Sequence, residues 1–245
     1  MSESAEPAAG RWWVRAGGWY LLAFLACLSA GWLMGVLAHF DRLIEPDGLD
    51  YRVLDWVRLH RKALPGVTRL MLAATRLGNV RVGTGAVVVS TAIFAVWERQ
   101  RRPGIRRHDW GFWILVTLGA RLLCLAIKTF FQRPRPPLID RLVQETSFSF
   151  PSGHSFSTAA FFTVWVVLFC RAARDEPAWV RIAWIALAVM MTLVVGCSRI
   201  WLTVHYFSDV CGGLLLGMAW ASLCCLIHYT QHPRRLDAGS ESALG

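Results

Sequence analysis

Six apolar stretches of roughly twenty residues each constrain the fold of this chain more than any other feature. They run approximately over residues 19–40, 80–97, 110–130, 156–170, 179–197 and 210–229. A helix of ~20 residues is long enough to cross ~30 Å of hydrocarbon, and in lipid only helices and closed barrels satisfy their backbone hydrogen bonds. Because the stretches lack the period-two alternation of strands, the sequence predicts an all-α, polytopic membrane fold with six transmembrane helices.

Composition supports a single membrane domain. Of the 245 residues, 55% are hydrophobic and only 17% are charged, which departs from the composition of a soluble domain. We expect one six-helix domain over residues 16–232, with disordered tails at 1–15 and 233–245. The first apolar stretch is longer than a secretory h-region and lacks a small-x-small cleavage site, so it is interpreted as a retained span.

Arginine placement predicts the orientation of the spans. The short connection over residues 98–107 contains five arginines, and short basic loops stay in the cytoplasm. With six alternating spans, both tails are then cytoplasmic, and we expect a multi-pass protein of the inner (plasma) membrane. We attribute the net charge of +10 to the arginines of the cytoplasmic loops and to an anion-binding site on the periplasmic or extracellular side. The charge therefore does not indicate a nucleic-acid partner.

Three polar stretches fall on that outer side. They are Lys128 with Arg135 and Pro136, then Pro151-Ser152-Gly153-His154, and finally Ser198-Arg199 with His205 and Asp209. A transferring phosphoryl group spreads negative charge over its equatorial oxygens, so a metal-free site must surround it with cations and N–H donors. The combination therefore points to phosphoryl transfer without a metal or another cofactor.

His205 and Asp209 are four residues apart, so both side chains share a face if a helix has begun by Tyr206. Asp209 could then fix the imidazole tautomer and leave the other nitrogen free as a nucleophile. The alternative is an ordinary buried histidine. Arg199, six residues upstream, favours the functional interpretation, because ionisable groups beside a membrane span are costly.

The stretch from Pro151 to His154 has the composition of a helix start. Ser152 can cap the helix, Gly153 lets the backbone approach a ligand, and the exposed N–H groups of a helix start favour anions. His154 would stand over the bound group as general acid, although an ordinary helix start with an exposed histidine is the alternative.

The basic residues at and after the end of the third apolar stretch, residues 110–130, also allow simpler interpretations. Lys128 could be a snorkelling anchor, and residues 133–136 could be a stiff basic turn. Arg121 lies about 10 Å deeper on the face of Lys128, and we expect it to face the bundle interior or a polar cavity.

Between the first two apolar stretches, the spacing of apolar residues predicts two amphipathic helices that are separated at Pro65-Gly66. They could lie in the membrane interface, with Arg58, Arg61 and Lys62 toward headgroups, or pack on the bundle.

The seven cysteines are interpreted as packing residues, with a disulfide between Cys197 and Cys211 as the alternative.

The three stretches, in this order, resemble the three signature motifs of the type 2 phosphatidic acid phosphatase superfamily. The resemblance covers residues 128–209 and implies that His205 forms a phosphohistidine, that Asp209 orients it, and that His154 protonates the leaving oxygen and then assists water. The groups implied to hold the phosphoryl oxygens are Lys128, Arg135, Arg199, Ser152 and the Gly153 amide. No metal is implied.

The leading hypothesis is a phosphatase for a lipid phosphomonoester or pyrophosphate. Candidate substrates are phosphatidate, phosphatidylglycerol phosphate, undecaprenyl pyrophosphate and lipid A. The alternatives are a lipid phosphotransferase with the same phosphohistidine, a vanadium haloperoxidase, disfavoured by six spans without a large soluble domain, and a non-enzymatic anion transporter. The oligomeric state is left open.

Overall fold

The computed structural model describes residues 9–39, 48–79, 108–172 and 176–231, with scattered positions between 82 and 96. Within them the elements are α1 (Ala9–His39), α2 (Leu49–Arg61), α3 (Pro65–Leu77), α5 (His108–Phe131), the 3-10 turn η1 (Leu138–Asp140), α6 (Gly153–Ala172), α7 (Ala178–Trp201) and α8 (Phe207–Gln231). No strand occurs in these residues. The all-α prediction is therefore confirmed for the described part of the chain.

Four helices of the described chain are long and apolar enough to cross a membrane. They cover Gly17–His39, Gly153–Cys170, Ala178–Trp201 and Phe207–His228, and they correspond to the first, fourth, fifth and sixth predicted spans. The third predicted span coincides with α5, which is not among the four. Most of the second, over residues 80–97, lies outside the described residues, so the count of six stays a prediction.

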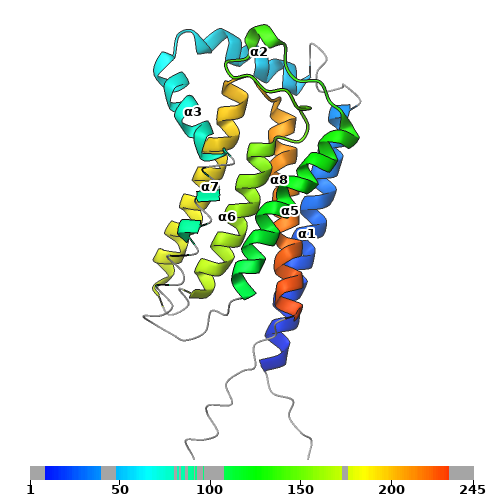
Figure 1. Ribbon diagram of the computed structural model, residues 1–245, viewed down its shortest axis with the longest axis vertical. Helices are drawn as coiled ribbons and strands as arrows, with labels where there is room; N and C mark the ends of the chain where they lie inside the picture. The colour runs from blue at the N-terminus through cyan, green and yellow to red at the C-terminus, as the bar shows by residue number, and fades with distance from the viewer. Residues whose placement is uncertain are drawn as a thin grey trace, which may run out of the picture.

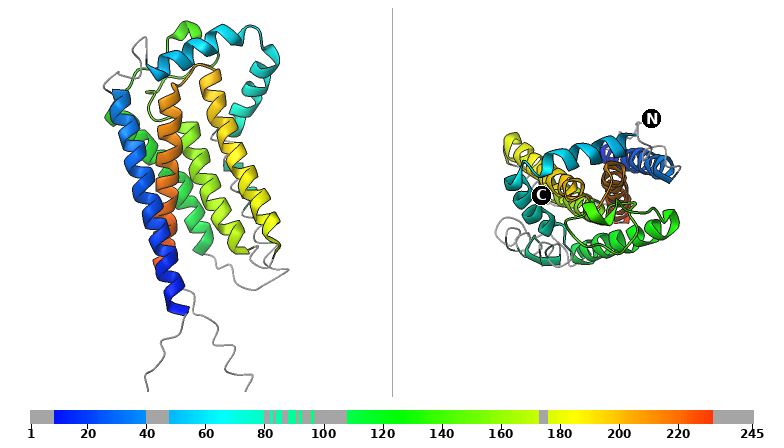
Figure 2. Two further views of the ribbon diagram at one scale, coloured as in Figure 1. Left: turned by 180° about the vertical axis from the view of Figure 1, so that it is seen from behind. Right: turned by 90° about the horizontal axis from the view of Figure 1, so that it is seen from above.

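The long helices form one bundle around α8. Helix α1 packs lengthwise against α8, α6 packs between α8 and α7, and α5 packs on α6 (Figures 1 and 2). The first residues of α1 and the last residues of α8 lie at the same end of the bundle (Figure 1). The end of α5, the start of α6, the end of α7 and the start of α8 lie at the opposite end, so chain topology alone brings the three polar stretches together there.

Two glycines in α8 determine how closely α8 approaches α6. A Cβ at Gly213 would lie 2.7 Å from the backbone oxygen of Ser152, and one at Gly217 would lie 2.3 Å from that of Phe156. Small residues four apart are a common means of bringing two membrane helices into backbone contact. The close packing places the start of α6 directly beside the start of α8.

The segment before the second span forms two helices, as predicted, with Pro65 as the first residue of α3. Helix α2 lies across the end of the bundle that carries the polar stretches, and α3 runs down beside α7 (Figures 1 and 2). Arg58 pairs with Asp140 at 2.5 Å, and Arg61 donates to the Asp140 carbonyl at 2.7 Å. The helices thus pack on the bundle, which is the second of the two alternatives, and Arg58 and Arg61 both bind Asp140.

None of the seven cysteines forms a disulfide bond. The alternative of a disulfide between Cys197 and Cys211 is therefore wrong. Cys124, Cys224 and Cys225 are buried among apolar side chains of the bundle core, which is the packing role expected of small apolar residues in a membrane helix.

Candidate active site

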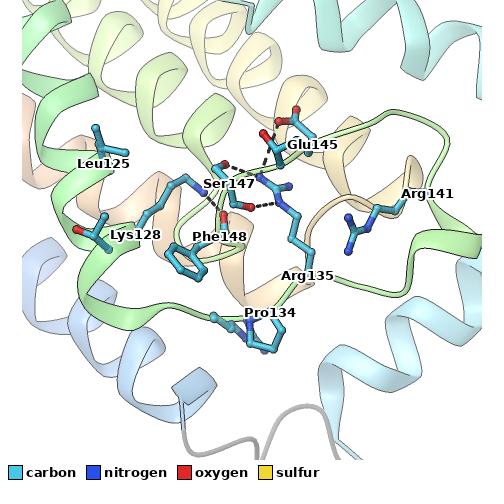
Figure 3. A pocket seen from close by; sticks show the side chains of 11 residues that line it. Leu125, Lys128, Pro134, Arg135, Arg141, Glu145, Ser147 and Phe148 are labelled. Carbon is cyan, nitrogen blue, oxygen red and sulfur yellow. Dashed lines mark hydrogen bonds and ion pairs between the residues drawn. The ribbon is translucent and has the colours of Figure 1, made fainter.

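Lys128 lies in the last turn of α5 and is turned inward. Its Nζ donates to the Phe148 carbonyl at 2.5 Å and to the Ser149 carbonyl at 3.3 Å (Figure 3). The side chain is buried, so it is not extended toward a lipid–water interface. The snorkelling alternative is therefore excluded, and the ammonium group stands at the loop that leads into α6.

Arg135 connects this loop with the segment between α7 and α8. Its Nε donates to the Ser147 carbonyl at 2.6 Å, and its Nη1 donates to the Val204 carbonyl at 2.7 Å (Figure 3 shows the Ser147 side). The same Nη1 lies 3.2 Å from Nε2 of His205. The first and third polar stretches are thus in direct contact, as the sequence predicts.

The environment of His205 fixes its tautomer. A guanidinium group has no acceptor, so Nε2 must accept from Arg135, and the ring proton is assigned to Nδ1. Nδ1 faces Oδ2 of Asp209 at 3.5 Å, which is longer than an ordinary hydrogen bond. The imidazole is buried, and burial lowers its pKa well below the usual value, since the charged form is poorly solvated there. The ring is therefore neutral, with its lone pair on the side of Arg135.

Asp209 is held by groups that the sequence analysis did not single out. Its Oδ1 accepts from Nη1 of Arg133 at 2.5 Å, and its Oδ2 accepts from Oγ of Ser149 at 2.5 Å and from the backbone N–H of Tyr206 at 2.9 Å. A second carboxylate, Asp50 of α2, accepts from Nη2 of Arg133 at 2.8 Å. From the sequence, Arg133 was interpreted only as part of a basic turn and Asp50 was not predicted at all, because no spacing rule joins residues 83 positions apart.

Arg199 contributes the next cation of the cluster. Its Nη2 lies 2.5 Å from Oε1 of Glu145, and its Nη1 donates to Oγ1 of Thr75 at 2.6 Å. Glu145 also approaches Nη2 of Arg135 at 3.8 Å. Burial alone would raise the pKa of Glu145, but the positive charges of Arg199 and Arg135 outweigh it and hold the pKa below its ordinary value. Glu145 was not predicted as a site residue, because its loop carries no periodic pattern.

The second polar stretch opens α6 as predicted. Ser152 precedes the helix, and its Oγ accepts a long 3.5 Å hydrogen bond from the Ser155 N–H, while its own N–H donates to the Asp209 carbonyl at 2.9 Å. A Cβ on Gly153 would lie 3.9 Å from Cε of Lys128, so the Gly153 backbone lies beside that side chain. The small residues thus let the start of α6 approach both Lys128 and Asp209.

His154 packs against the residue that follows α3 and lies near α7. The close packing of α3 places Gly78 so near that a Cβ there would lie 2.5 Å from Cδ2 of His154 and 2.9 Å from Cγ1 of Val195. Thr158 donates to the His154 carbonyl one turn further along α6. The structure thus puts His154 at the site end of the bundle, and its function as general acid stays a prediction.

A pocket of about 430 Å³ opens beside this cluster, between the end of α5 and the loop that follows it (Figure 3). It is lined by four basic residues, Lys128, Arg133, Arg135 and Arg141, together with Glu145 and the apolar side chains of Leu125 and Phe148. Leu125 and Phe148 are both exposed, whereas Lys128 and Arg133 are buried and Arg135 and Arg141 are partly buried. The pocket therefore combines a cationic region with an apolar rim.

Arg121 lies one heptad below Lys128 on α5, and its side chain is partly buried. The expectation that it faces the bundle interior or a polar cavity stays a prediction, as does its role. Within the described part of the chain, no three His, Cys, Asp or Glu side chains are placed to hold a metal ion together.

These observations define a class: a multi-pass helical membrane protein with a cationic, histidine-containing site at one end of the bundle. The model of the PAP2 superfamily matches residues 110–233 of the 245. The chain belongs to the PAP2 superfamily, and the resemblance stated from the three motifs is confirmed.

Two curated relatives are named phosphatases. The chain is 37% identical over 114 residues to phosphatidylglycerophosphatase B of Bacillus subtilis, covering 46% of this chain and 55% of that protein. It is 40% identical over 83 residues to lipid A 1-phosphatase of Rhizobium etli, covering 34% of this chain and 30% of that protein. The aligned stretches thus span about half or less of these relatives.

Two solved structures share the fold. The crystal structure of a transmembrane PAP2 type phosphatidylglycerolphosphate phosphatase from Bacillus subtilis matches with a TM-score of 0.73 at 24% identity, over 87% of this chain and 98% of that chain. The crystal structure of Aquifex aeolicus LpxE matches with a TM-score of 0.53 at 22% identity, over 70% of this chain and 93% of that chain.

Proposed function

We propose that this protein is an integral membrane phosphatase that hydrolyses a lipid phosphomonoester or pyrophosphate through a phosphohistidine on His205. The observation that carries the proposal is the pair of contacts on that ring, with Arg135 at Nε2 and Asp209 at Nδ1. The imidazole is neutral, with one nitrogen facing a carboxylate and the other facing Arg135, which lines the cationic pocket. This is the protonation state that a nucleophile requires.

In the first step, the lone pair of His205 Nε2 attacks phosphorus, and the bond from phosphorus to the leaving oxygen breaks. The leaving oxygen takes a proton, which we assign to His154. Asp209 stabilises the positive charge that develops on the His205 ring.

In the second step, water attacks the phosphohistidine, and the bond between phosphorus and Nε2 breaks. His154, which lost its proton in the first step, accepts one from that water. The products are an alcohol or a lipid phosphate, depending on the substrate, and inorganic phosphate. His154 returns to its starting protonation state.

The phosphoryl oxygens are bound by groups that already converge at this end of the bundle. We assign this role to Lys128, Arg135, Arg199, Ser152 and the Gly153 amide. Fixed cations and N–H donors of this kind stabilise the charge of the transition state, which is the task that metal ions perform in other phosphatases. The reaction we propose requires neither a metal nor another cofactor.

The pocket supports a lipid substrate. Its apolar rim at Leu125 and Phe148 and its basic interior at Lys128 and Arg135 suit a molecule with an anionic head and an apolar tail. The names of the relatives agree with this class, and the candidates are phosphatidate, phosphatidylglycerol phosphate, undecaprenyl pyrophosphate and lipid A. We further propose six spans, cytoplasmic tails and a site at the outer face of the inner membrane.

The deciding experiment compares purified wild-type protein with His205→Asn in detergent containing EDTA, on a panel of these lipids. We expect the wild type to release stoichiometric inorganic phosphate and the variant to lose at least about 10³-fold in kcat, because the nucleophile is absent while the side-chain size is kept. Vanadate, which adopts the five-coordinate geometry of the transition state, should inhibit.

Three results would contradict the proposal: turnover by His205→Asn at the wild-type rate, loss of activity in EDTA that Mg²⁺ restores, or anion flux in liposomes without phosphate release. Phosphate transfer to an acceptor lipid without free phosphate would instead identify a phosphotransferase.

A further inference from the structure

A buried chain of three charges connects the crossing helix α2 with the His205–Asp209 pair. The guanidinium of Arg133 donates from Nη2 to Asp50 at 2.8 Å and from Nη1 to Asp209 at 2.5 Å. Asp50, Arg133 and Asp209 are 1%, 2% and 0% exposed. Asp50 lies in α2, outside the stretch that the family model matches.

The rest of the cluster is arranged to keep these charges in place. Ser208 donates to Asp50 through both its backbone N–H, at 2.8 Å, and its Oγ, at 2.5 Å. The Arg133 guanidinium also stacks over the Tyr206 ring, with Cζ 4.5 Å from the ring centroid. Burying three charges is costly unless each is paired, so the arrangement calls for a function beyond attaching α2 to the bundle.

The net charge of the cluster explains why two carboxylates are present. Arg133 alone would hold Asp209 firmly but would also cancel its negative charge, and Asp209 would then support a positive His205 ring only weakly. With Asp50 on the other side of Arg133, the three groups together carry a charge of −1. The guanidinium can thus fix the position of Asp209 while a full negative charge remains beside the imidazole.

We propose that Asp50 and Arg133 are positioning residues of the catalytic site, and that Asp50 supplies the charge that lets Arg133 hold Asp209 without neutralising it. The inference rests on the proposed function of His205 as nucleophile. It makes α2 part of the active site, although α2 carries none of the three motifs.

Other charged groups also face His205. Arg135 lies 3.2 Å from Nε2 on the opposite edge of the ring, and Lys128 of α5 acts on the ring from a greater distance. The backbone carbonyl of Arg199 accepts from the His205 N–H at 3.3 Å. These groups are the same in every variant considered below, and residues 50 and 133 both act on the Asp209 side of the ring. Arg133 in addition lines the pocket, so the effect on KM is judged from Asp50→Asn alone.

The test is a cycle of charge variants, with kcat, KM and the acid limb of the kcat/KM pH profile as readouts. Asp50→Asn brings the cluster to a net charge of 0, Arg133→Gln to −2, and the double variant back to −1. Because negative charge raises the pKa of a histidine, Asp50→Asn should move the acid limb to lower pH and Arg133→Gln to higher pH, each by about half to one unit.

For Asp50→Asn we expect kcat to fall about tenfold, since the positive ring of the intermediate loses support. KM should stay within about twofold, because Asp50 does not line the pocket. The double variant should recover the wild-type position of the acid limb and most of kcat. Arg133→Gln leaves two buried carboxylates unpaired and is expected to unfold more readily, so the double variant also provides the measurement if the single one does not fold.

Arg58→Gln is the matched control. It removes another ion pair of α2, that with Asp140, which is partly exposed and includes no member of the cluster formed by Asp50, Arg133 and Asp209. We expect its kcat and acid limb to match the wild type. If Arg58→Gln lowers kcat as much as Asp50→Asn, or if the double variant is worse than both single variants with no movement of the acid limb, the cluster only anchors α2 and the inference is overturned.

The proposed function is tested separately within the same set of proteins. If His205→Asn is inactive and Asp50→Asn turns over at the wild-type rate, the phosphatase mechanism stands and only the positioning role of Asp50 falls. If His205→Asn remains active, the nucleophile itself is wrongly assigned.

Discussion

At the residue scale, burial and two unlike neighbours determine the chemistry of His205. The ring is removed from water, which disfavours its charged form, while Arg135 at one nitrogen and Asp209 at the other act in opposite senses. Burial is the largest of these influences, and it holds the pKa of His205 well below that of a free histidine. The imidazole is therefore neutral at neutral pH, as the proposed nucleophile requires.

This shift has consequences for both activity and stability. The acid limb of kcat/KM should lie below pH ~6.5, the value for an unperturbed histidine. Between pH ~6.5 and the lower pKa of the folded state, His205 is protonated in the unfolded chain but neutral in the folded protein. The free energy of unfolding should therefore decrease as the pH falls through this range. His205→Asn should remove this part of the pH dependence of thermal unfolding in detergent. An unchanged slope in the variant would show that other groups cause it.

Sequence spacing predicted the proximity of residues that lie on one helix or beside one turn, and their roles stay predictions. His205 and Asp209, and Ser152 with Gly153, were found because local geometry alone brings their side chains or amides together. Asp50 and Glu145 were missed for the converse reason: each is brought to the site by the packing of a helix or loop far away in the sequence, to which no periodicity applies.

At the element scale, the crossing of α6 and α8 sets the geometry of the site. The start of α6 lies against α8 because Gly213 and Gly217 carry no side chain where α8 meets the backbone of Ser152 and Phe156. The same contact brings the Ser152 N–H to the Asp209 carbonyl. The site therefore depends on two glycines that take no part in its chemistry.

Gly217→Ala should be destabilising for this reason. Its Cβ would lie 2.3 Å from the backbone oxygen of Phe156, so the helices must separate, at a cost of about 1–3 kcal/mol. We expect a lower unfolding temperature and a reduced kcat. Gly66→Ala in α3 is the control, because its Cβ would meet nothing within 4 Å, and it should be neutral or slightly stabilising. Equal unfolding temperatures for the two variants would contradict the packing argument.

At the scale of the whole molecule, the candidate active site lies at one end of the bundle, and the described ends of the chain lie at the other. The polar stretches, α2 and the pocket lie at one end, and the first described residues of α1 and the last of α8 lie at the other (Figure 1). If the tails are cytoplasmic, as the arginine distribution predicts, the site faces outward.

Cysteine labelling can determine this orientation. Ile139→Cys places a thiol on the 92% exposed position of η1 at the site end, and Ala178→Cys places one at the start of α7 at the other end. We expect a membrane-impermeant maleimide to label the first variant in intact cells and the second only after the membrane is opened, each measured above the wild-type background. The reverse pattern would show that the site faces the cytoplasm.

The sequence by itself determined the helical class, the positions of most spans and the three polar stretches, because hydrophobic length and local spacing are properties of contiguous residues. Only the tertiary structure decided that Arg58 and Arg61 turn to Asp140, that Glu145 joins two arginines, and that Asp50 reaches Arg133. Apart from the contact between Glu145 and Arg135, these contacts link residues more than fifty positions apart. Their existence depends on how α2 and the loop before α6 pack on the end of the bundle. The physical reason is that ion pairing at a buried site is determined by three-dimensional proximity and desolvation, neither of which is encoded in local sequence pattern.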